Sequence, residues 1–168
     1  MTSESFFLDI AKIAITIAGF GGVIAALRHP RDQGWEANEV AGLKLILEHS
    51  FAAVASGLLP SVLYLYFSDE PEVWLVSSSL LALFLAFELL INIVRLRHAT
   101  ALGSPPRKFG LLLSTFLVPT TVFLFFQILN VFYWRGPVTF AAGAVWLIVA
   151  ACFQFFIFVL HIRPKEKA

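Results

Sequence analysis

The stretch that decides the fold is VWLVSSSLLALFLAFELLINIV, residues 73–94, an apolar run whose one charged residue is Glu88. A helix that spans a bilayer needs about 20 mostly apolar residues, so this run predicts a transmembrane helix. Of the 168 residues in the chain, 59% are hydrophobic and 14% are charged, and the mean hydropathy is +0.84. So few charges, bunched between apolar runs, cannot coat a soluble domain. The sequence therefore excludes a soluble enzyme and predicts an all-α, polytopic transmembrane helical bundle.

Similar apolar runs occur elsewhere, and together they predict one transmembrane domain over residues 1–168 with five spans: 7–27, 41–67, 73–94, 109–133 and 138–161. The first span is the weakest, because Asp9 and Lys12 lie near its start. Four spans plus an interfacial or re-entrant first segment therefore remain an alternative. The N-terminus lacks the basic region of a signal peptide, so we expect the first helix to be retained. Segments 28–41 and 96–108 are expected in the cytosol.

The positions of the basic residues predict the orientation. If the N-terminus lies outside and the C-terminus in the cytoplasm, ten of the twelve Lys and Arg residues fall on the cytoplasmic side, as the positive-inside rule requires. The turn SDEPE, residues 68–72, has three acids and no base, as expected of an external turn. The prediction is a multi-pass protein of a cell inner membrane, with membrane lipid as a partner.

Small residues recur every three or four positions in the first predicted helix, IAKIAITIAGFGGVIAAL, residues 10–27. Such stripes let helix backbones approach closely in lipid. Tight packing within one protomer is one interpretation. The other is that this helix lies near the axis of a homo-oligomer and lines a conduit, through Thr16, Gly19, Gly21 and Gly22.

Three helices are expected to place a polar residue at a similar depth. Glu48, Glu88 and Gln154 each lie about 10–14 Å inside the cytoplasmic boundary, counted at the helical rise of ~1.5 Å per residue, and Asn92 flanks them. Such a polar layer fits a buried hydrogen-bond network with Glu88 protonated or paired, a cation path or proton site, or a ligand site. Asp9, Asp69, Glu70 and Glu72 are expected to form an acidic outer mouth that favours cations.

Gln127 and Asn130 form a further polar pair near the outer end of the fourth span. Their i,i+3 spacing places both side chains on one side of the helix. Two interpretations are open, a helix contact and part of an outer vestibule.

No motif for an enzyme, a metal or a cofactor is found. The lone Cys152 excludes an intramolecular disulfide, and His29, His49, His98 and His161 do not fit a haem site with facing ligands at matched depth. The cytoplasmic bases would attract acidic lipid headgroups, a nucleotide, an oligonucleotide or a partner protein: Arg28, Arg31, Arg95, Arg97, Arg107 and Lys108.

The phrase IAITIAGFGGVIAALR with the Trp- and Glu-containing loop after it is similar to the first span of small prokaryotic membrane proteins, a resemblance that transfers no functional residue. In size and shape the chain is similar to compact transmembrane effectors of bacterial antiviral systems, which depolarise or permeabilise the inner membrane. The expected function is a homo-oligomeric ion channel or membrane-permeabilising protein, gated from the cytoplasm as an antiviral-defence effector. A membrane anchor or subunit of a larger complex, and a small membrane enzyme or cofactor carrier, are the alternatives.

Overall fold

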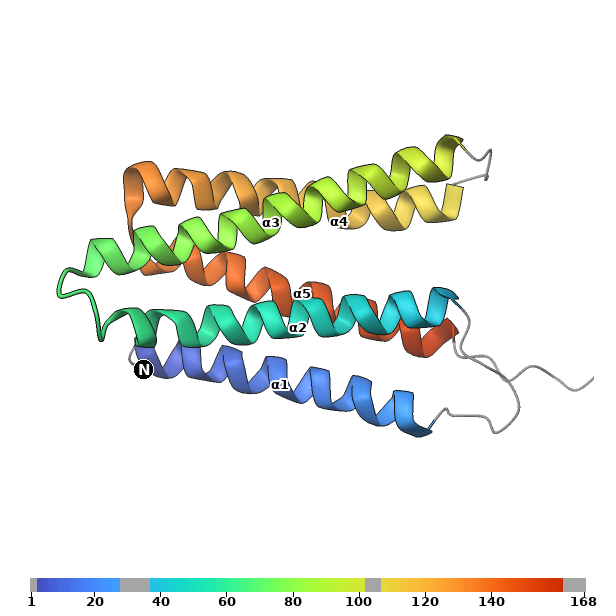
Figure 1. The fold of residues 1–168 in the computed structure, drawn as a ribbon, viewed down its shortest axis with the longest axis horizontal. Helices are drawn as coiled ribbons and strands as arrows, with labels where there is room; N and C mark the ends of the chain where they lie inside the picture. Colours follow the sequence, from blue (N-terminus) through green and yellow to red (C-terminus); the bar gives the residue numbers. More distant parts are fainter. Residues whose placement is uncertain (1–2, 28–36, 102–106, 162–168) are drawn as a thin grey trace, which may run out of the picture. The chain divides into compact units, whose positions relative to one another are not determined.

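The computed structural model describes residues 3–27, 37–101 and 107–161, and these residues are almost entirely helical. The elements are α1 (Ser3–Leu27), α2 (Ala37–Leu63), α3 (Glu70–Ala101), α4 (Arg107–Leu129), the π-helical turn η1 (Asn130–Trp134) and α5 (Pro137–His161) (Figure 1). Among these described residues, five helices are long and apolar enough to cross a membrane. This confirms the predicted all-α fold with five apolar helices, and it is consistent with a multi-pass membrane protein.

Large apolar side chains cover the outside of the helices. Leu83 is 68% exposed, Phe87 63% and Val118 63%. A soluble protein rarely leaves so many large apolar side chains in water, whereas lipid tails accept them. The exposed apolar side chains and the length of the apolar helices are thus both consistent with a membrane environment.

The C-terminal ends of α2, α3 and α4 differ from the prediction, and α4 ends at Leu129 because the π-helical turn η1 follows it. Helix α2 ends at Leu63 rather than Phe67, because Leu65 N donates to Val62 O (3.1 Å) and Tyr66 N to Leu63 O (3.0 Å), which tightens the chain into a turn. Helix α3 continues to Ala101 and so includes part of the segment expected in the cytosol. Its continuation follows from the sequence, because no glycine or proline interrupts it before Gly103.

The chain divides into two compact units, which are described separately. The first unit contains α1, α2 up to Leu58 and α5 from Leu147. The second unit runs from Leu59 to Trp146 and contains α3, α4, η1 and the start of α5.

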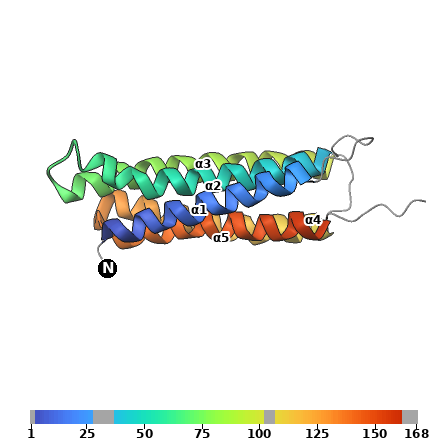
Figure 2. The same cartoon turned by 90° about the horizontal axis from the view of Figure 1, so that it is seen from below.

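In the first unit, α1 and α2 run antiparallel and side by side (Figures 1 and 2). Gly57 sets their separation, since a Cβ atom there would lie 2.6 Å from Phe7 O and 2.9 Å from Ala11 N. Ala14 and Ala53 are fully buried. Small residues on both helices thus let the two backbones approach closely, as is common in lipid.

In the second unit, the chain reverses direction in the turn between η1 and α5. Arg135 adopts a left-handed conformation with φ 46°, which costs about 1–2 kcal/mol for a residue with a Cβ atom. Its N–H donates to Asn130 O at 2.8 Å and completes the wide π-type turn. The reversal therefore needs two residues, Arg135 and Gly136, between the helices.

We expect Gly57→Ala to lower the free energy of unfolding by about 2–3 kcal/mol, because the added methyl group must push apart two backbones rather than a flexible side chain. Gly22→Ala is the matched control, because nothing lies within 4 Å of its Cβ position. That control should be neutral or up to about 1 kcal/mol more stable, from helix propensity. Unfolding in mixed micelles, followed by tryptophan fluorescence, measures both; equal effects would contradict the assigned contact.

Candidate functional site

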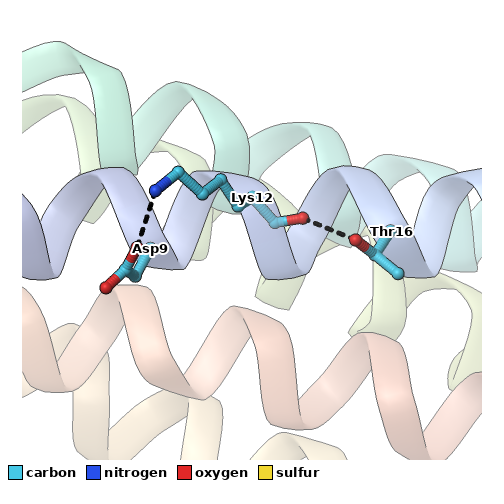
Figure 3. Close-up of polar contacts among 3 residues, drawn as sticks. All are labelled: Asp9, Lys12 and Thr16. Carbon is cyan, nitrogen blue, oxygen red and sulfur yellow. Dashed lines mark hydrogen bonds and ion pairs between the residues drawn. The ribbon is translucent and has the colours of Figure 1, made fainter.

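The outward face of α1 carries an ion pair inside a candidate membrane span. Lys12 Nζ lies 2.9 Å from Asp9 Oδ1, and the side chains are 75% and 50% exposed. Thr16 Oγ1 donates to Lys12 O at 2.8 Å, so the three residues line one face of the helix (Figure 3). This face is separate from the packing face of α1, to which Ala11 and Ala14 belong.

The structure divides the predicted axial residues between these two faces. A Cβ atom at Gly21 would lie 3.5 Å from Ile46 Cγ2, so Gly21 packs against α2. Gly19 and Gly22 have nothing within 4 Å of their Cβ positions, and Thr16 is exposed. Packing within the protomer therefore accounts for Gly21, and the other three residues remain on the open surface.

On α2, too, the exposed and the buried polar residues lie on different faces of the helix. Lys44 Nζ lies 3.5 Å from Glu48 Oε1, and the side chains are 65% and 44% exposed. The next residue, His49, is 2% exposed, and its Nδ1 atom lies 2.9 Å from Leu45 O, a geometry that suits a proton on Nδ1. The stripe from Val40 through Lys44 and Glu48 to Val62 is therefore outward, and His49 is inward.

The first unit buries polar atoms as well, and sequence reasoning did not identify Ser50 among them. They include His49, Ser50 and the amide oxygen of Gln154. Ser50 Oγ and Gln154 Oε1 have no hydrogen-bond partner among the residues that the structure describes. The signal available in the sequence was the spacing of Ile46, His49, Ser50 and Ala53, which puts them on one helical face.

The predicted polar layer includes residues of both units. Glu48 and Gln154 belong to the first unit, and Glu88 and Asn92 to the second. Glu88 and Asn92 are half-buried, and the Oε2 atom of Glu88 is buried. A single layer made by all four residues stays a prediction.

In the second unit the polar pair Gln127 and Asn130 is fully buried, which supports the helix contact over the vestibule. Asn130 Nδ2 donates to Ser78 Oγ (2.7 Å) and to Gly136 O (3.0 Å), and Asn130 Oδ1 accepts from Gly136 N (3.0 Å). The side chain thus joins α3 to the turn before α5.

Gln127 makes a second cross-helix contact one turn away, where its Nε2 donates to Thr139 O at 2.8 Å. A Cβ atom at position 143 would lie 2.6 Å from that same nitrogen, so Gly143 leaves the space that the amide occupies. Trp146 Nε1 adds a bond to Thr120 Oγ1 at 3.3 Å. These bonds fix α3, α4 and the start of α5 to one another.

The predicted acidic mouth is exposed, and part of it has a local structural role. Trp74 Nε1 donates to Glu70 Oε1 at 3.2 Å, and Tyr64 also hydrogen-bonds Glu70. Glu70 and Glu72 stand in the first turn of α3, where negative charge offsets the helix dipole. Asp69, directly before the helix, is a favoured N-cap residue type.

The predicted anion-contact residues divide between described and undescribed parts of the chain. Arg95 and Arg97 are exposed near the end of α3. Arg107 and Lys108 begin α4, which runs beside α3, so all four belong to the same end of this helical pair (Figure 1). Arg28 and Arg31 lie outside the described residues.

The polar residues thus form an outward set of ion pairs, a buried set in each unit, and acidic and basic helix ends. Among the described residues no group of three or more His, Cys, Asp or Glu side chains could hold a metal ion. The chain matches no protein-family model, no curated protein and no solved structure.

Asn130→Ala should lower the free energy of unfolding by about 3 kcal/mol, because it removes three hydrogen bonds, one of them to the buried Ser78 hydroxyl and two to the half-buried backbone of Gly136. Thr121→Val is the control, since the exposed Thr121 hydroxyl donates to Leu117 O of its own helix and its loss should cost under about 0.5 kcal/mol. Chemical unfolding in mixed micelles compares the two. Equal destabilisation would show that Asn130 does not hold the turn.

A further prediction concerns Tyr64, whose pKa is raised above 10.0 by burial, by the charge of Glu70 and by its hydrogen bond to Glu70. The unfolded chain then ionises first as pH rises, so the stability from the neutral phenol is present below pH 10 and is lost through the folded-state pKa. In a tyrosinate absorbance titration, the step removed by Tyr64→Phe should lie above pH 10. Glu70→Gln should shift that step to lower pH; an unchanged step would contradict the role of Glu70.

Proposed function

We propose that this chain is the subunit of a homo-oligomeric ion-conducting or membrane-permeabilising protein of a prokaryotic inner membrane. The observation that carries the proposal is the exposed Lys44–Glu48 pair on the outward stripe of α2. Glu48 lies eight residues beyond Val40, the start of the candidate span, or about 12 Å along the helix. Its side chain is nevertheless 44% exposed.

A charged group at such depth cannot face hydrocarbon cheaply. Insertion scales put the cost at about 2.5–3.5 kcal/mol for a charge at the centre of a membrane helix. The pair with Lys44 reduces this cost but leaves both side chains open on the surface of the chain. An outward charge of this kind is best explained by water or another protein surface beside α2.

A homo-oligomer can place both water and another protein surface beside α2. The described part of one chain has five candidate spans, few helices with which to enclose a channel, whereas an oligomer can build a pathway along the surfaces where its copies meet. Glu48 carboxylates along such a pathway favour cations. Asp69 and Glu72, exposed beside the start of α3, would add negative charge at the outer mouth.

The proposed orientation places the N-terminus outside and the basic ends of α3 and α4 in the cytoplasm. Arg107 and Lys108 stand in the first turn of α4, where the helix dipole disfavours positive charge. Their presence against this local preference is explained by the positive-inside rule. The same bases offer a cytoplasmic surface for an anionic ligand, and gating by such a ligand would suit an antiviral-defence effector.

In proteoliposomes the protein should pass cations in preference to anions. Glu48→Gln should lower the cation-to-anion permeability ratio about tenfold, the equivalent of about 1.4 kcal/mol of lost attraction. Thr121→Val, which removes an exposed uncharged hydroxyl group from α4, is the control and should leave the ratio unchanged. Reversal potentials under a salt gradient measure the ratio.

Two outcomes would contradict the proposal in different ways. A permeability ratio unchanged by Glu48→Gln would remove Glu48 from the pathway. If the purified protein conducts nothing, the exposed pairs belong to contacts with another protein, and a role as membrane anchor or subunit is favoured instead.

A further inference from the structure

The outward face of α1 begins with a charged residue and continues with small or uncharged residues. Lys12, Thr16, Gly19, Val23 and Ala26 recur every three or four positions, and all are exposed. They lie opposite the packing face, where Ala11, Ala14 and Gly21 are buried. The face is therefore open along its length within the first unit.

The ion pair at the start of this face is only partly satisfied. Asp9 and Lys12 lie four and seven residues beyond Ser5, the start of the candidate span, or about 6 and 10 Å along the helix. A carboxylate offers about four acceptor sites and an ammonium three donors, and the pair uses one of each in its 2.9 Å contact. The remaining sites face outward, because the two side chains are 50% and 75% exposed.

We propose that this face binds the same face of α1 in a second copy of the chain. The proposal deepens the proposed function and rests on it for the homo-oligomer. Copies inserted with one orientation and related by an axis along the membrane normal present parallel α1 helices. Asp9 of each copy then lies within one turn, about 4.5 Å along the axis, of Lys12 in its neighbour.

This charge pattern is self-complementary. Each carboxylate can accept from the neighbour's ammonium while it keeps its own, so the two pairs merge into one four-charge network. Gly19, two turns further along the same face, has nothing within 4 Å of its Cβ position, which permits close approach of the helices below the charges. The small-residue surface that follows the charges suits the backbone of another helix rather than a lipid headgroup.

Charge reversal in two differently tagged copies tests the pairing. Asp9→Lys alone or Lys12→Asp alone should abolish self-association, because each gives the face charges of one sign. Co-expression of the two variants should restore association, and only as a mixed oligomer that carries both tags. Pull-down of one tag in mild detergent, with detection of the other, measures this. Absence of the mixed oligomer, or self-association of either variant, would overturn the proposal.

Cysteine cross-linking provides a second, independent readout. The background is Cys152→Ala, since Cys152 is exposed. In membranes, Gly19→Cys should form a disulfide-linked dimer of twice the 18.6 kDa chain mass. Ile13→Cys, also exposed but on the flank of α1, is the matched control and should not. Equal cross-linking at both positions, or none at Gly19, would overturn the interface.

Comparison with ion flux separates this proposal from the function. A Gly19 cross-link without any flux would support the interface and contradict conduction. Flux without the Gly19 cross-link would support conduction and overturn the α1 interface.

Discussion

The cost of leaving a polar group in hydrocarbon is the constraint on which the structure depends. It requires the backbone to close its hydrogen bonds within helices, and it then acts on each polar side chain that remains. Asn130 shows how the constraint is met within the chain, because its amide bonds to Ser78 and to both backbone groups of Gly136. Gln127 repeats the solution one turn away, in space that only a glycine at position 143 leaves open.

The proposed function rests on the polar residues that the chain leaves exposed. Asp9 and Lys12 on α1, and Lys44 and Glu48 on α2, form ion pairs along their own helices and still remain open. The buried residues of α2 lie on its other face, at His49 and Ser50. The first unit thus separates buried polar residues from those available to water or another copy.

The helices could be predicted from the sequence because long apolar runs depend on local composition alone. The end of α2 at Leu63 could not, because Tyr64, Leu65 and Tyr66 are apolar or aromatic and the turn that they form depends on Tyr64 and Trp74 meeting around Glu70. The sorting of Glu48 outward and His49 inward also needed the structure, since hydropathy treats both as polar. The small stripe on α1 was recognised, but its partner Gly57 on α2 was missed, although the spacing Ala53-x-x-x-Gly57 was visible.

The two-residue reversal between η1 and α5 has a consequence for synthesis of the protein. Only Arg135 and Gly136 separate the π-helical turn from α5, so we expect the two helices to enter a bilayer together, as a hairpin held by the amide of Asn130 on Gly136. A lengthened turn would separate these partners and uncouple insertion of the two helices.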